Sequence, residues 1–226
     1  MNMNNLNTKD QLVKSSFYIT YAFLITTGTI TFIEAIRTND AKVRHILNLE
    51  TVISIIASFF YSQFVKKIQN NKLDLDYKDI NRTRYLDWAI TTPFMLIVLC
   101  LVFAYNNKTT VKASYIGLVL LINYLMLGSG YLGEINQLPR NVALIIGFVC
   151  FFLLFGILYY TYLMGKNKFD DKLIYWAFVI FWVFYGVVYN LNEETKNISY
   201  NILDLFSKCF IGIFFWAYLT KVITIF

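Results

Sequence analysis

The sequence predicts an all-α fold: a single-domain bundle of seven transmembrane helices. Three observations lead to this prediction. Of the 226 residues, 58% are hydrophobic and only 15% are charged, which is too apolar for an ordinary soluble domain. The chain has 10 Gly and only 2 Pro, so few residues interrupt a long helix. Apolar runs of about 20 residues, enough to cross a bilayer core of roughly 30 Å, recur along the chain.

Seven such runs fit, one after another. The first follows a polar amino-terminal stretch that does not resemble a cleavable signal peptide, so we expect this first helix to direct the chain to the membrane. The runs cover approximately residues 13–36, 46–65, 85–104, 113–133, 141–163, 173–191 and 199–226. Residues 1–226 are therefore assigned to one multi-pass integral membrane domain.

The connectors between the runs are short and polar, as in "RTNDAK" (37–42) and "NNK" (106–108). Short connectors imply that successive helices are antiparallel neighbours. The connector 66–82 is longer, and its alternating segment "KLDLDYKDI" suits a small hairpin and a plain loop equally well. Lys and Arg outside the runs divide evenly between the two sets of loops, so the charge rule for orientation gives no answer.

Composition argues against two other kinds of protein. Cys100, Cys150 and Cys209 lie inside apolar runs, so we expect small core residues and no disulfide framework. The formal charge of +6 suits anionic lipid headgroups. The basic residues form no compact patch along the sequence, so nucleic acid binding is not expected.

Ionisable residues inside the runs are few, and they fall at matching depths. Each costs about 2.5–3.5 kcal/mol at the bilayer centre, so a partner or a function is expected. Asp87 and Asp204 lie near the starts of the third and seventh runs, which enter the membrane from the same face. Lys208 follows Asp204 by one turn, and Arg84 precedes Asp87 by one turn. These four side chains are predicted to meet near the middle of the bundle.

This charged cluster has two interpretations. One is an inert salt bridge that holds two helices together. The other is a functional site, which is favoured because replacing buried ion pairs by apolar residues is often neutral or stabilising. A lone lysine in an aromatic bundle is chemically suited to form a Schiff base with an aldehyde.

The sequence "RYLDWAITTP" (84–93), together with "DLFSK" (204–208), closely resembles the microbial (type 1) rhodopsins. The resemblance extends along most of the chain, including "LMLGSGYLG" (125–133) and "WVFYGVVY" (182–189), and is greatest to the rhodopsins of large algal viruses. It implies a seven-helix bundle with an internal pocket that holds all-trans retinal, covalently bound.

The resemblance also implies roles for individual residues. Lys208 would carry retinal as a protonated Schiff base, and Asp87 and Asp204 would be its counterions. Arg84 would be the outward gate, and Tyr61 would hydrogen-bond Asp204. The residues expected to line the retinal polyene are Trp88, Met95, Met126, Gly130, Trp182, Tyr185 and Tyr189.

The sequence departs from the archetypal proton pumps of this family at three positions. The carboxylic acid that reprotonates their Schiff base is replaced here by Val98. Gly186 stands where the sixth helix usually has a kinking proline, and Asn123 stands where a carboxylate often lies near the retinal ring. The proton donor of the archetypal pumps is therefore missing.

A different acid, Glu50, lies on the second helix, on the side of the cluster opposite the outward gate. With Ser54 it begins a polar stripe at four-residue spacing. Three interpretations stay open: Glu50 snorkels toward the headgroups, donates the missing proton, or lines a constriction in a cation pathway. Thr91 on the third helix and Asn201 on the seventh would add uncharged groups to this path.

A glutamate in a polar path resembles channelrhodopsins and viral rhodopsins more than dedicated pumps. The resemblance therefore favours a light-gated cation channel of the viral rhodopsin type. A light-driven outward proton pump is the alternative, and a sensory photoreceptor ranks third. No enzymatic activity is expected. The expected partners are membrane lipids and transported cations or protons, a homo-oligomer is left open, and the amino terminus is expected outside the cell.

Overall fold

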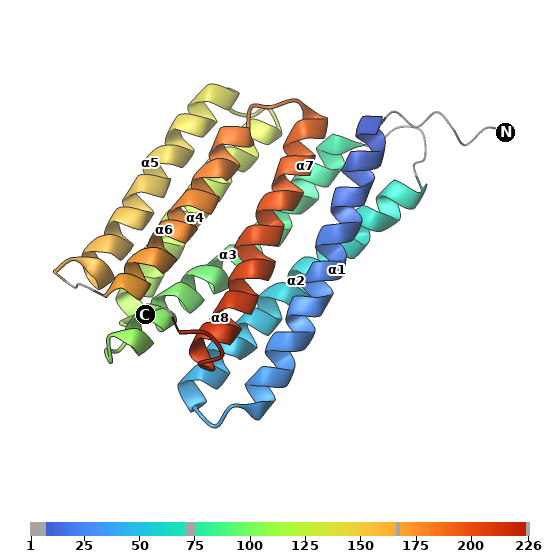
Figure 1. The fold of residues 1–226 in the computed structure, drawn as a ribbon. Helices are drawn as coiled ribbons and strands as arrows, with labels where there is room; N and C mark the ends of the chain where they lie inside the picture. Colours follow the sequence, from blue (N-terminus) through green and yellow to red (C-terminus); the bar gives the residue numbers. More distant parts are fainter. Residues whose placement is uncertain (1–7, 71–75, 166–167, 225–226) are drawn as a thin grey trace.

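The chain, in a computed structural model, is a bundle of long helices packed side by side (Figure 1). The structure describes residues 8–70, 76–165 and 168–224. Seven segments of this described part are long and apolar enough to cross a membrane, and no strand occurs in it. The predicted fold class is therefore confirmed.

The helices extend beyond the apolar runs at most of their ends. A helix of 30 residues, such as the first, is about 45 Å long, so its polar ends reach past the hydrocarbon core into the headgroup layers. The bounds are α1 (Thr8–Arg37), α2 (Ala41–Asn70), α3 (Tyr77–Asn106), α4 (Ala113–Glu134), α5 (Arg140–Leu158), η1 (Tyr159–Leu163), α6 (Phe169–Val188), α7 (Glu193–Asp204), η2 (Leu205–Phe210) and α8 (Ile211–Leu219). The segments α7, η2 and α8 follow one another without a break and form the seventh span.

Polar residues set the starts of two helices that carry the site. The Asp76 side chain accepts a hydrogen bond from the Asp79 backbone N–H at the start of α3. The Asn192 side chain accepts one from Thr195 at the start of α7. The hairpin considered for 72–80 is wrong from Tyr77 onward, because those residues are helical. Residues 71–75 lie outside the described part.

Successive spans run in opposite directions, as the short connectors predicted (Figure 1). We call the half of the bundle where α1, α3, α5 and α7 begin the N-side half, which is at the top of Figure 1. We call the half where α2, α4 and α6 begin the C-side half. Neighbouring spans pack closely, above all α1 against α2 and α4 against α5.

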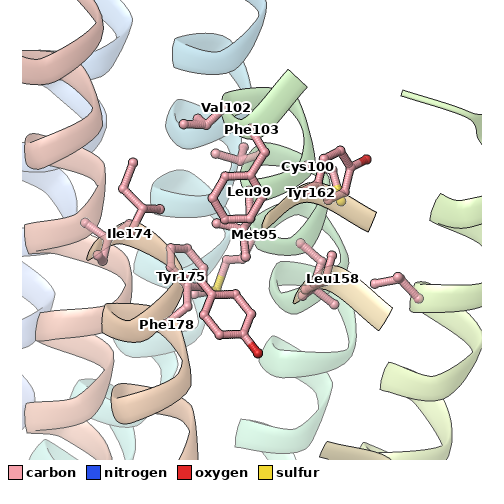
Figure 2. Close-up of a cluster of buried hydrophobic side chains, with 14 of the residues drawn as sticks. Met95, Leu99, Cys100, Val102, Phe103, Leu158, Tyr162, Ile174, Tyr175 and Phe178 are labelled. Carbon is pink, nitrogen blue, oxygen red and sulfur yellow. The ribbon is translucent and has the colours of Figure 1, made fainter. Parts of the chain in front are cut away.

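The C-side half is filled by apolar side chains. Figure 2 shows Leu99 and Phe103 of α3 facing Tyr175 and Phe178 of α6, with Leu158 of α5 beside them. All of these side chains are buried. The three cysteines are also buried and free, as predicted. Polar contacts also occur in this half: Asp171 accepts hydrogen bonds from Asn106 and Asn107, and the Thr31 and Thr51 hydroxyl oxygens are 2.9 Å apart.

Candidate functional site

Lys208 lies in the π-helical turn η2, in the middle of the last span. Its Nζ atom is 2.7 Å from Asp87 Oδ2 on α3 and 3.6 Å from Asp204 Oδ1, one turn earlier on its own helix. All three side chains are buried to 1% exposure or less. The structure thus brings together the lysine and both carboxylates that the sequence predicted to meet.

Arg84 completes the charge balance. Its Nη1 atom is 3.3 Å from Asp204 Oδ2, so two buried cations face two buried carboxylates. The guanidinium carbon also lies 5.2 to 5.7 Å from the ring centres of four aromatic residues, a geometry that stabilises a cation. Those residues are Phe17, Tyr61, Phe64 and Tyr200. We refer to Arg84, Asp87, Asp204 and Lys208 as the central cluster.

The two carboxylates of the central cluster differ in their hydrogen bonds. Asp204 accepts from the Tyr61 hydroxyl at 2.8 Å, as predicted, and from the Tyr185 hydroxyl at 2.7 Å, which the sequence did not reveal. The Trp88 indole adds a longer contact of 3.4 Å. In contrast, Asp87 Oδ1 has no hydrogen-bond partner among the described residues. Asp87 is therefore the carboxylate with a free acceptor atom.

Lys208 opens onto a cavity with mainly apolar walls. All seven residues predicted to line the polyene are found there: Trp88, Met95, Met126, Gly130, Trp182, Tyr185 and Tyr189. Sequence reasoning missed further wall residues, including Tyr85, Phe148, Phe151 and Tyr200. Phe148 and Phe151 belong to a span that is apolar almost throughout, so no pattern distinguished them from lipid-facing aromatics.

Two glycines shape this cavity by admitting aromatic side chains. A Cβ atom on Gly130 would lie 2.6 Å from the Tyr85 hydroxyl oxygen. A Cβ on Gly186 would lie 2.6 Å from Cζ of Phe148. The glycine that replaces the usual proline in α6 thus accommodates an aromatic ring of the cavity wall.

A chain of hydrogen bonds leads from the central cluster toward the N-side surface. Arg84 Nη2 donates to Asn197 Oδ1 at 3.3 Å, and Asn197 Nδ2 donates to Asn81 Oδ1 at 3.1 Å. Asn81 Nδ2 in turn donates to carboxylate oxygens of Glu134 and Glu193, both at 2.7 Å. Three helices, α3, α4 and α7, contribute to this chain.

A buried ion cluster closes the chain at the N-side. Lys196 is fully buried, and its Nζ atom lies 3.1 Å from Glu134 and 2.9 Å from Glu193. Arg140, about one third exposed, contacts the same two carboxylates at 3.5 and 3.3 Å. We call Asn81, Glu134, Arg140, Glu193, Lys196 and Asn197 the N-side network. Sequence reasoning treated Arg140 and Lys196 as loop charges, and for Lys196 this was wrong because α7 begins earlier than the apolar run.

Glu50 lies in the C-side half, where its side chain is 3% exposed. Among the described residues, none forms a hydrogen bond or an ion pair with its carboxylate. Ser54, one turn further along α2, is fully buried, and its hydroxyl has no partner in the described part. The Thr91 hydroxyl is occupied, because it donates to the Asp87 carbonyl of its own helix at 2.8 Å.

Asn201 and Glu50 do not share one path, contrary to the prediction. Asn201 lies on the N-side of Lys208, where its Oδ1 accepts from Arg84 Nη2 at 2.8 Å and its Nδ2 donates to Ser16 at 2.8 Å. Glu50 lies on the C-side. The reason is direction along the last span: a residue that precedes Asp204 lies nearer the N-side end of that span.

The sequence matches the family described as bacteriorhodopsin-like protein over residues 11–222. The chain belongs to this family. It is therefore a multi-pass integral membrane protein of a family of light-driven transporters and photoreceptors that bind retinal covalently.

Individual rhodopsins show how far the likeness extends. The chain is 49% identical to the viral rhodopsin OLPVRII, with a TM-score of 0.87 over 94% of this chain and 100% of that one. It is 28% identical over 153 residues to Opsin-1 of Neurospora crassa, covering 61% of this chain and 48% of the opsin. It is 26% identical over 162 residues to the blue-light absorbing proteorhodopsin of Gamma-proteobacterium Hot 75m4, covering 61% of each. The chain thus spans about half to three fifths of these two curated relatives.

The residues around the cavity fit a rhodopsin's retinal. Lys208 offers a primary amine at the cavity wall, which is the group that condenses with an aldehyde. Aromatic and aliphatic walls suit an apolar polyene. Asp87, with one oxygen 2.7 Å from Nζ and the other free, provides the negative charge that a protonated nitrogen needs.

Proposed function

We propose that this rhodopsin is a light-driven proton pump that moves protons from the C-side to the N-side, with the amino terminus outside the cell. The observation that supports this most is the buried environment of Glu50. It is a buried carboxyl in the apolar half of the bundle, with no cation beside it in the described part. The sequence alone favoured a channel, and the burial of Glu50 changes that preference.

Retinal, when bound at Lys208 Nζ, supplies a light-driven isomerisation that weakens the hold of this nitrogen on its proton. Asp87 is the proposed acceptor, because Oδ2 is 2.7 Å from Nζ and Oδ1 is free of donors in the described part. Asp204 is a poorer acceptor, since hydroxyl and guanidinium donors already stabilise its charge. We assign Asp204 to holding the cation of Arg84 and orienting the site.

Arg84 and the N-side network form the proposed exit side. The guanidinium links Asp204 to Asn197, so it stands between the site of proton transfer and the N-side surface. A fixed positive charge in this place repels protons that would return from the N-side. The asparagine side chains hydrogen-bond each other, and Asn81 donates to both carboxylates of the network.

Glu50 is the proposed donor that returns a proton to Nζ. An ionised carboxylate without a partner is very costly in an apolar interior, so the neutral acid is the stable form there. A neutral acid can give up one proton and take another from the C-side surface. It replaces in function the carboxylic acid that is absent at Val98.

A cation channel is the second candidate. A conducting path needs charged or carbonyl oxygens and water along its length. The unpartnered Ser54 hydroxyl next to Glu50 on α2 offers one place for water, which favours this candidate. The apolar packing of Leu99, Phe103 and Phe215 in the same half argues against a continuous wet path.

The test is Glu50→Gln, which keeps the shape and removes the proton. Flash spectroscopy in the visible range should show that Nζ regains its proton on the order of 100-fold more slowly. Added azide, a small proton carrier, should restore the rate. The matched control is Glu34→Gln, because Glu34 lies at the C-side end of α1 in an exposed ion pair with Arg37. Control and unmodified protein should have the same rate.

Photocurrents against voltage separate pump from channel. A pump's current keeps its sign over the physiological voltage range, whereas a channel's current reverses with the cation gradient. If Glu50→Gln leaves the reprotonation rate unchanged and the current reverses, the proposal is wrong and the channel is favoured.

A further inference from the structure

Gly212 lies on the last span, four residues after Lys208 and toward the C-side. It is buried, and a Cβ atom built on it would lie 3.1 Å from Glu50 Oε2 and 2.9 Å from Thr27 Cγ2. Both distances are shorter than ordinary carbon contacts of about 3.5–4.0 Å. The missing side chain of Gly212 therefore leaves the space that the Glu50 carboxyl occupies.

The atoms around Gly212 distinguish this glycine from one that only lets two helices approach. The closest neighbours of its Cβ position are the ends of two side chains, from α2 and α1. By comparison, a Cβ on Gly28 of α1 would meet the Ser54 Cβ at 3.2 Å and the Ile55 backbone N at 4.0 Å, which are contacts at or near the backbone of α2. Gly212 thus accommodates a functional group, whereas Gly28 allows close packing.

The location of Gly212 relative to Lys208 places the Glu50 carboxyl close to the lysine that carries retinal. Four residues of helix advance about 6 Å along the axis, so the Glu50 carboxyl beside Gly212 lies about one turn from the backbone of the retinal lysine. Lys208 Nζ itself contacts Asp87 and Asp204, so a proton from Glu50 would reach it along water molecules. The buried Ser54 hydroxyl, unpartnered in the described part, is a further polar group on the same face of α2.

We infer that Gly212 is a positioning residue for proton return: by lacking a side chain, it seats the Glu50 carboxyl one turn from Lys208. This inference rests on the proposed role of Glu50 as proton donor. The residue does not touch the reacting atoms. It acts by fixing where the acid lies, on a rigid span that also carries the lysine.

Graded substitutions test this inference. Gly212→Ala should displace the carboxyl by a few tenths of an ångström and slow proton return to Nζ on the order of threefold. Gly212→Val adds two more carbons and should slow it roughly 10- to 100-fold. Azide should restore both rates. The absorption maximum should stay unchanged, because Asp87 and Asp204 are untouched. The matched control is Gly156→Ala in α5, where a Cβ meets nothing within 4 Å.

Two combined variants separate positioning from general damage. Gly212→Val with Glu50→Gln should be no slower than Glu50→Gln alone, because the amide at position 50 has no proton to donate wherever it is placed. Gly212→Ala with Thr27→Ser removes the methyl that the new Cβ would meet, so the protein folds with only the Glu50 contact changed. Proton return to Nζ should still be slow in this double variant.

The outcomes also separate this inference from the proposed function. If Glu50→Gln slows proton return to Nζ but every Gly212 variant returns the proton at the normal rate, Gly212 has no positioning role, while Glu50 remains the donor. If Gly212→Val slows the Glu50→Gln protein further, or azide fails to restore its rate, the effect does not pass through Glu50 and the inference is wrong. A normal rate for Glu50→Gln itself overturns the proposed function.

Discussion

The two halves of the bundle on either side of Lys208 are built in opposite ways. On the N-side, hydrogen bonds and ion pairs run from Asp204 through Arg84 to Glu134, Lys196 and the surface. On the C-side, apolar side chains fill the space between α3, α5 and α6, and the buried acid Glu50 has no partner among the described residues. The retinal lysine lies at the boundary.

This difference has a physical consequence for the direction of transport. A polar network can accept and redistribute charge close to where it is released. An apolar half resists charge, so a proton can cross it only on a group that becomes neutral when it binds the proton. An asymmetric bundle of this kind favours release toward the N-side and supply from the C-side through one carrier.

The largest expected effect comes from removing the group shared by both halves. Lys208→Ala should abolish visible absorption completely after reconstitution with retinal, because no other buried amine lines the cavity in the described part. Absorption spectra measure this directly, and Lys42→Ala, an exposed lysine, serves as the control. A Lys208→Ala protein that kept a covalent chromophore would refute the assignment of Lys208.

The next effect concerns the N-side network. Lys196→Met should destabilise the protein by about 3–5 kcal/mol, because it leaves buried Glu134 without its closest cation. Loss of the visible band on heating or in detergent reports this stability. Lys42→Met, on the surface, should change the free energy of unfolding by only about 0.5 kcal/mol. Equal effects of the two variants would show that the network is not structural.

The same logic predicts the opposite result in the C-side half. Glu50→Leu removes an unpartnered buried carboxyl, so stability should stay the same or rise by about 1 kcal/mol, while proton return to Nζ slows as in Glu50→Gln. Stability and function would thus separate in one half and coincide in the other. A strongly destabilised Glu50→Leu protein would indicate a partner for Glu50 and would contradict the comparison.

The sequence predicted those parts of the site that follow from the geometry of single helices. Lys208 and Asp204 are one turn apart on one helix, and Arg84 and Asp87 are nearly one turn apart on another, so helical spacing brought four charges together. The seven spans followed equally directly from apolar length. The family motifs then supplied the residues that line the cavity.

Features that depend on how helices pack could not be predicted in this way. Lys196 was predicted to lie in a loop because the first turns of α7 are polar and precede the apolar run from which the helix was predicted. The seat at Gly212 depends on side chains from α1 and α2 that are distant in sequence. Asn201 was placed on the wrong side of Lys208 because its polarity was considered without its direction along the span.

The smallest expected effect lies at the C-side surface, where Asp40 precedes α2. Its Oδ1 atom accepts from the backbone N–H groups of Lys42 and Val43 at 2.8 and 3.3 Å, and its Oδ2 accepts from the Tyr105 hydroxyl at 3.1 Å. Slight burial acts to raise the pKa of this carboxyl, but the hydrogen bonds outweigh it and lower the pKa below its usual value. The ionised form is therefore the one that stabilises the folded chain.

A lowered pKa in the folded protein means that Asp40 stabilises fully above the ordinary aspartate pKa of about 3.9, and that this contribution is lost as the pH falls further. Asp40→Ala should cost about 1 kcal/mol at pH 7, with the difference from unmodified protein shrinking at pH 3. Asp40→Asn can still cap the helix and should cost less at pH 7, with no loss of its own on acidification. Thermal loss of the visible band, compared at both pH values, measures each difference, since titration of Asp87 is common to all three proteins. If the difference in stability between Asp40→Ala and unmodified protein is the same at both pH values, the charge of Asp40 does not stabilise the C-side end of the bundle.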